Sequence, residues 1–198
     1  MMNRFEQLMN IAKKNNGMIT SKQVDEHGIH RQYLSELVKR GQLEKSERGV
    51  YTLVDSFEDR LFSLQSRFSK GIYSHGTALY LHRMTDRTPL KYTMTFPASY
   101  NVKNAQNHGV DTYRTNRKFH SIGIVDAQTD NHHIVRVYSV ERTLCDLVRG
   151  ACKMNKEDVV NAFKEYSKRN DKDLNALFKY AALFKVESTI RGYMEVLI

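Results

Sequence analysis

The sequence has no tryptophan, two prolines, two cysteines and no long hydrophobic run. Cys145 and Cys152 cannot build a disulfide framework, so a reduced, cytoplasmic setting is the simplest expectation. The longest apolar run, residues 180–184, falls far short of the ~20 residues that a membrane-spanning helix needs. The first 17 residues are amphipathic and carry Glu6, which is unlike a secretory signal. We therefore expect no membrane partner.

The 198 residues contain enough apolar side chains to fold, with 40% hydrophobic and 27% charged residues. This composition excludes wholesale disorder, and the length fits one large domain or two small ones. The 31 Lys and Arg residues outnumber the 22 Asp and Glu residues, and a net charge of +9 favours nucleic acid or another polyanion as a partner. Residues 1–54 hold 9 basic and 6 acidic side chains, so the excess is not confined to one segment.

Residues 1–54 have the clearest pattern. Apolar side chains recur at helical spacing at Phe5, Leu8, Met9 and Ala12, and Gly17 is suited to end that helix. Residues 20–26 then begin with a Thr-x-x-Gln capping box and predict a short second helix. Gly28 permits a turn, and a third helix follows with a buried stripe of Leu34, Leu37 and Val38. Two helices joined by a short glycine-containing turn are typical of a helix-turn-helix.

A predicted β-hairpin follows the third helix. Residues 42–46 form its first strand, residues 47–49 the turn, and residues 50–53 the alternating second strand. Three helices and a hairpin predict a winged helix-turn-helix DNA-binding domain over residues 1–54. A linker helix is expected within residues 55–69, with apolar positions at Phe57, Leu61, Leu64 and Phe68.

The third helix presents polar side chains opposite its apolar stripe. A recognition helix offers its N-terminal residues to base edges, where Arg suits guanine, Gln suits adenine and Ser suits either. We therefore expect the start of the helix to contact bases or nearby phosphates and its end to contact a phosphate. The hairpin, which forms the wing, is expected to reach the DNA backbone or the minor groove. The expected DNA contacts are Arg31, Gln32, Ser35, Lys39, Arg40, Lys45 and Arg48.

Two alternatives remain for this domain. In the first, the polar face of the third helix is only exposed to solvent and binds nothing, and Glu36 on this face would repel phosphate. Winged helices also serve as protein-interaction modules, and salt-insensitive binding to a protein would favour that role.

Several segments together resemble a known family. Residues 17–24, 28–34, 37–41, 43–44 and 48–51 resemble the N-terminal domain of AbiEi-type antitoxins, which belong to bacterial abortive-infection (type IV toxin–antitoxin) systems. The resemblance continues through YSHGTALYLH at residues 73–82, TMTFP at residues 93–97 and YSVERTLCD at residues 138–146. Residues 98–132 and 150–198 add nothing to it.

The resemblance implies a protein with two roles in phage defence. Its winged domain would bind the promoter DNA of its own operon and repress transcription. Its C-terminal domain, residues 70–198, would counter a nucleotidyltransferase-like toxin without forming a stable complex with it. The resemblance implies no catalytic residue and no cofactor.

Residues 70–198 predict a mixed α+β domain that ends in a helical layer. Strands are expected near residues 91–97, 110–114, 119–126 and 133–138, a polar loop at 98–107, and helices at 140–149, 156–168, 174–185 and 188–197. Ser74 is expected to cap a helix. Arg142 and Asp146 are spaced as a helical ion pair and are the tentative antitoxin surface.

The remaining candidates for chemistry are weaker. His75 and His82 are seven residues apart without an evident third ligand, so no metal site is expected. Asp111 and Asp126 on strands raise the rival interpretation of a nuclease-like catalytic domain fused to a DNA-binding head. Metal-dependent cleavage of DNA or RNA would favour that rival.

Overall fold

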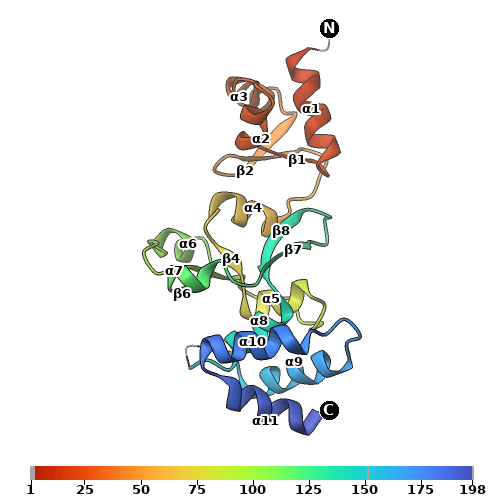
Figure 1. Cartoon of the computed structure of the whole chain (residues 1–198). Coiled ribbons are helices and arrows are strands. Elements are labelled where there is room, and N and C mark those ends of the chain that lie inside the picture. The colour runs from red at the N-terminus through yellow and green to blue at the C-terminus, as the bar shows by residue number, and fades with distance from the viewer. Residues whose placement is uncertain (1–2, 151, 198) are drawn as a thin grey trace. The chain divides into compact units, whose positions relative to one another are not determined.

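A computed structural model describes residues 3–150 and 152–197 and divides the chain into two compact units (Figure 1). Unit 1 contains residues 1–69 together with 128–135, and unit 2 contains residues 70–127 and 136–198. Both units mix helices and strands, so the expected α+β class is confirmed. The division at residues 54 and 69 stays a prediction, and the expected linker helix is α4 (Arg60–Arg67), which lies in unit 1.

Unit 1 begins with three helices and a small antiparallel sheet in the order β1-β3-β2. The Thr20–Gln23 capping box is present, and Gly17 adopts a φ of +87°, so these two local signals are confirmed. The elements before α4 are α1 (Arg4–Lys14), β1 (Met18–Thr20), α2 (Ser21–Glu26), α3 (Gln32–Lys39), β2 (Leu43–Glu47) and β3 (Val50–Leu53).

The core of unit 1 joins the apolar faces of the three helices. Leu8, Ala12, Leu34 and Leu37 are fully buried there, and Leu43 of β2 closes the cluster. Strand β1 pairs with β3 although the sequence pattern did not indicate it. All three residues of β1 are buried, so they show no alternation that would mark a strand.

Unit 2 is built on a five-stranded mixed sheet in the order β6-β5-β4-β8-β7. Strand β4 pairs antiparallel with β5 and parallel with β8, and β5 pairs parallel with β6. The hairpin between β7 and β8 contributes residues 128–135 to unit 1. The elements are β4 (Ile72–Tyr73), α5 (His75–Leu81), β5 (Thr93–Pro97), α6 (Lys103–Asn107), β6 (Asp111–Thr115), α7 (Arg117–His120), β7 (Ile124–Gln128), β8 (Ile134–Tyr138) and α8 (Val140–Leu147).

Three further helices complete unit 2: α9 (Lys156–Lys168), α10 (Leu174–Phe184) and α11 (Glu187–Leu197). They pack with α8 around one core, as the blue helices of Figure 1 show. Leu144, Phe163, Tyr166, Leu177 and Ile190 are fully buried in it. The predicted helical layer is therefore confirmed for the described residues.

Two local predictions in unit 2 are wrong. Residues 98–107 were expected to be a loop but contain the short helix α6. Residues 119–126 were expected to be one strand, but α7 and a turn occupy their first part and β7 begins only at Ile124. Asn116 caps α7, and Gly123, with a φ of +73°, changes the direction of the chain before β7.

Among the described residues, no helix has both the length and the apolar character that crossing a membrane requires.

Candidate nucleic-acid interface

The residues that the sequence assigned to DNA lie on helix α3, at the two positions that flank it and on the β2–β3 hairpin. The side chains of Arg31, Gln32, Ser35 and Lys39 are exposed while Leu34 and Leu37 of the same helix are buried. The helix is thus amphipathic as predicted, and its polar face is open to solvent. Arg40, Lys45 and Arg48 are exposed as well.

Arg31 lies at the start of α3 and already has an anionic partner. Its guanidinium donates to both carboxylate oxygens of Asp25 on α2, with Nε 2.9 Å from Oδ1. The hydrogen bond from Arg31 lowers the pKa of the Asp25 carboxyl. Both groups are exposed, so this ion pair contributes little to stability and can be exchanged for a phosphate or a base edge.

The other candidate side chains differ in how strongly partners within the protein already hold them. Gln32 donates from Nε2 to the Glu36 carboxylate over 3.3 Å, so its amide is only weakly held. The guanidinium of Arg40 stacks over the Phe5 ring at 4.1 Å and links α3 to α1. Arg40 is therefore partly committed to packing, whereas Lys39 in the last turn extends into solvent.

The hairpin is held in place by a residue that the sequence reasoning missed. Glu47, at the end of β2, has only 8% of its side chain exposed and accepts hydrogen bonds from Arg60 at 2.9 Å and Arg67 at 2.6 Å. Both arginines belong to α4, so α4 supports the hairpin that carries Lys45 and Arg48. Nothing in the sequence spacing signals this contact.

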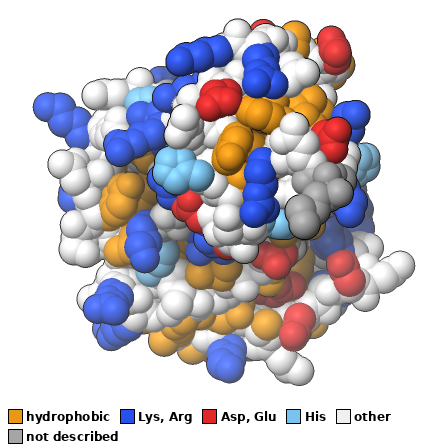
Figure 2. Space-filling view, turned by 90° about the horizontal axis from the view of Figure 1, so that it is seen from above, with side chains coloured by type: hydrophobic (Ala, Val, Ile, Leu, Met, Phe, Trp, Pro, Cys, Tyr) orange, Lys and Arg blue, Asp and Glu red, His pale blue; other side chains and the backbone are white. Residues whose placement is uncertain are grey.

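Basic side chains are dispersed over the face that Figure 2 shows. Figure 2 shows Lys and Arg side chains in blue, separated by uncharged and a few acidic ones, without one continuous basic patch in this view. This agrees with a charge excess that is spread along the chain.

A buried polar cluster connects the hairpin tip of residues 128–135 to the rest of unit 1. His133 donates from Nδ1 to Asp59 over 2.8 Å and from Nε2 to the Asn15 carbonyl over 3.1 Å, and the Thr129 hydroxyl also donates to Asp59. Phe62 stacks on the His133 ring with 4.5 Å between centroids. The two partners of the His133 ring, a carboxylate and a backbone carbonyl, are both hydrogen-bond acceptors.

Acid should weaken this cluster. Burial raises the pKa of the Asp59 carboxyl, but hydrogen bonds from His133, Thr129 and the Phe62 amide outweigh burial and hold that pKa below its ordinary value. A depressed pKa in the folded state contributes stability above about pH 4, and this contribution is lost as pH falls through the folded pKa.

We expect Asp59→Asn to lower the free energy of unfolding at pH 7 by about 1–3 kcal/mol, because the buried His133 loses its anionic partner. Urea denaturation at pH 7 and at pH 3 measures the effect. The difference from the unsubstituted protein should be smaller at pH 3 than at pH 7, because the contribution of a carboxylate with a lowered folded pKa is lost as the pH falls below the unfolded pKa and through the folded one. Asp55→Asn, at an exposed carboxylate, is the control and should change stability by less than about 0.5 kcal/mol. A difference that stays constant with pH would contradict this assignment.

The predicted Arg142–Asp146 pair is present in α8, but its placement corrects the surface assignment. Nε of Arg142 lies 2.9 Å from Asp146 Oδ2, and the Arg142 side chain is fully buried. Its Nη1 donates to the carbonyls of Phe119 and Ile122. Arg142 therefore cannot form an exposed surface, because its side chain is buried. Its role is structural: the hydrogen bonds to the two carbonyls hold the chain around α7 against α8.

Gly123 is needed for the approach of this turn to α8. Its φ is +73°, and a Cβ at this position would lie 2.8 Å from Cβ of Arg142. A side chain here would thus be strained and would clash.

Ser74 occupies the N-cap position of α5 as expected, although its side chain makes no capping hydrogen bond. Its Oγ instead accepts from Thr95 at 2.8 Å and lies 3.0 Å from Nδ1 of His75. His82 contacts the Tyr138 carbonyl through Nε2. No group of three or more His, Cys, Asp or Glu residues within residues 3–150 and 152–197 is arranged to hold a metal ion.

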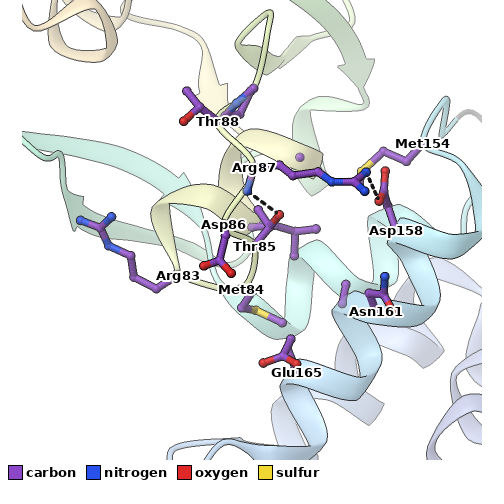
Figure 3. Close-up of a pocket in the computed structure, with 14 residues that line it drawn as sticks. Arg83, Met84, Thr85, Asp86, Arg87, Thr88, Met154, Asp158, Asn161 and Glu165 are labelled. Atoms are coloured by element: carbon purple, nitrogen blue, oxygen red, sulfur yellow. Dashed lines mark hydrogen bonds and ion pairs between the residues drawn. The ribbon is translucent and has the colours of Figure 1, made fainter.

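Unit 2 has a hollow of about 410 Å³ between the segment after α5 and helix α9 (Figure 3). Arg87 points across it and pairs with Asp158 at 3.2 Å, as the dashed line marks. Asp86 and Glu165 also line it, so its charges are mixed. This hollow is lined by both apolar and charged side chains, and it lies on the unit that the sequence assigned to antitoxin activity.

Comparison with solved structures shows a shared fold. The chain is similar to the crystal structure of the RV2827C protein from Mycobacterium tuberculosis, with a TM-score of 0.58 and 13% sequence identity. The similarity covers 92% of this chain and 72% of that one. At this identity the likeness concerns the fold alone. No curated protein sequence matches the chain.

A family model matches the segment that carries the candidate interface. The model is described as a transcriptional regulator, AbiEi antitoxin, and the match covers residues 6–54, about a quarter of the chain. It contains α3, the hairpin and all seven expected DNA contacts. The resemblance noted in the sequence is thus confirmed over this segment, because residues 6–54 match the AbiEi antitoxin family of transcriptional regulators.

Proposed function

We propose that this protein is the antitoxin of a type IV toxin–antitoxin system and represses its own operon. Residues 1–54 act as a winged helix-turn-helix that binds double-stranded promoter DNA in the cytoplasm. The rest of the chain counters a nucleotidyltransferase-like toxin without a stable complex. The observation that carries the proposal is the match of residues 6–54 to an antitoxin regulator family, in a segment whose third helix has an exposed polar face.

The proposed recognition places α3 in the major groove. Gln32 and Ser35 face outward from its first turns, and Arg31 at its start can leave Asp25 to reach a guanine or a phosphate. These residues would discriminate between sequences. Lys39, Lys45 and Arg48 would bind phosphates and supply affinity without sequence preference.

The division of roles is best tested in the full chain. Residues 128–135 pack in unit 1, so a cut near residue 54 or 69 would leave that unit incomplete. We therefore choose a variant that carries Gln32→Ala, Lys45→Ala and Arg48→Ala, all at exposed positions. It should fold as the unsubstituted protein does.

The variant and the unsubstituted protein are expressed from an unrelated promoter beside the toxin, which removes repression as a route to rescue. We expect both to restore growth equally, although the variant no longer represses a reporter under the operon's own promoter. Loss of rescue by the variant would show that DNA binding is part of antitoxin activity and would contradict the proposed division.

A further inference from the structure

A second, smaller cavity lies in unit 2, separate from the hollow of Figure 3. It is formed where β6 and the start of α5 approach α8, and Thr95 and Asp146 also line it. Its volume is about 50 Å³, several times the ~10–15 Å³ that one water needs. The side chains that matter for its chemistry are His75, Tyr113, Arg114, Thr115, Arg142 and Arg149.

Two hydrogen-bonding groups of this cavity are buried without a partner. They are Nη2 of Arg142 and the hydroxyl of Thr115, and these side chains belong to residues that are 0% and 8% exposed. Buried polar groups are nearly always paired, and an unpaired one costs about 1–3 kcal/mol, more if it is charged. Two such donors in one cavity indicate a ligand that accepts hydrogen bonds.

The charge of the cavity favours an anion. Asp146 provides the lining carboxylate, and it is shared between Arg142 at 2.9 Å and Arg149 at 3.1 Å. Arg114 adds a third guanidinium at an exposed position. Three arginines against one carboxylate leave about two positive charges, and guanidinium groups suit phosphate oxygens in geometry as well as charge.

His75 supplies a further donor. The Thr95 hydroxyl donates to Ser74 Oγ, which lies 3.0 Å from Nδ1 of His75; in the tautomer in which Ser74 donates to Nδ1, the ring carries its proton on Nε2. The His75 ring stacks on Tyr113 with 3.8 Å between centroids, and its backbone has a positive φ of 50°. Such strained backbone at a residue other than glycine is typical of functional sites.

We propose that this cavity binds a phosphate group, held by Arg142 and Thr115 from within and by Arg149 and Arg114 at its opening. The phosphate can be free or part of a nucleotide, because the cavity has room for the tetrahedral group and the exposed side of Arg114 and Arg149 leaves the remainder outside. Neither the family match nor the predicted DNA interface includes these residues.

The proposal is tested by isothermal titration calorimetry of the full chain in chloride buffer. Inorganic phosphate is titrated in one arm and a nucleoside monophosphate in another, with extra chloride of equal ionic strength as the reference. We expect saturable binding of phosphate that chloride does not reproduce. Equal affinities would identify the phosphate group alone as the ligand, and tighter monophosphate binding would identify a nucleotide; both results support the site.

Two variants connect binding to this cavity. Thr115→Val removes the unpaired hydroxyl at nearly constant shape, and Arg149→Gln removes a half-exposed charge. Each should weaken phosphate binding by about 10-fold or more, as expected for a hydrogen bond to a charged group. Lys103→Gln, an equal charge change at an exposed position of α6, should leave the affinity unchanged.

Thr115→Val also separates binding from a purely structural role. Without phosphate its thermal unfolding temperature should equal or exceed that of the unsubstituted protein, because no hydrogen bond is lost. Absence of phosphate binding by the unsubstituted chain, or unchanged affinity in both cavity variants, would overturn the proposal.

Discussion

Replacing Arg142 by methionine is expected to lower the free energy of unfolding by about 3–5 kcal/mol, the cost of leaving a buried ion pair with one partner. Arg142 neutralises the nearly buried Asp146 and is the donor to the carbonyls of Phe119 and Ile122. Its guanidinium also lies 4.1 Å from the Tyr138 ring centroid. Methionine can fill part of the volume but replaces none of these interactions.

Urea denaturation followed by circular dichroism measures this loss. Lys168→Met is the matched control, because Lys168 pairs with Glu165 on an exposed helix surface and its loss should cost less than about 1 kcal/mol. Arg142→Met combined with Asp146→Leu should recover part of the stability, since both charges are then removed. If Arg142→Met costs no more than Lys168→Met, the α8 pair does not stabilise unit 2.

The second large effect is expected in DNA binding. Replacing Lys39, Lys45 and Arg48 by alanine should weaken binding to all DNA sequences and reduce its salt dependence. Each lost phosphate contact reduces the slope of log affinity against log salt by about 0.9, so three lost contacts should reduce it by about 2.7. The residues are exposed, and the buried Glu47 that holds the hairpin to α4 is left in place.

Fluorescence anisotropy of a labelled duplex at several salt concentrations gives this slope. Replacement of Lys156, Lys164 and Lys179 in unit 2 by alanine removes the same charge elsewhere and should leave the slope unchanged. An equal decrease in both variants would mean that binding depends on overall charge and not on α3 and the hairpin.

Local signals predicted much of this fold. The helix at residues 156–168 was predicted with its observed limits, and the structure shows that the side chain of Asn155 caps it. The capping box at Thr20 fixed the start of α2 in the same way. Strands β1 and β4 were missed, since two or three consecutive buried residues have no period.

The contacts that stabilise the candidate sites could not be predicted from the sequence pattern, because most of them join residues far apart in the chain. Glu47 meets arginines 13 and 20 residues away, and His133 meets Asp59 from 74 residues away. Spacing along the chain carries no signal for such pairs. The Arg142–Asp146 pair was predicted because it is local, but its burial was not, since arginine is rarely fully buried unless it is paired.

Binding of the full-length protein to the DNA upstream of its own operon tests the central claim most directly. Gel-shift titration compares that DNA with unrelated DNA of equal length and composition, at several salt concentrations. We predict a preference for the upstream DNA that persists as salt increases, and loss of about 1–3 kcal/mol of this preference when Gln32 is replaced by alanine. Equal affinity for both DNAs at every salt concentration would contradict the account.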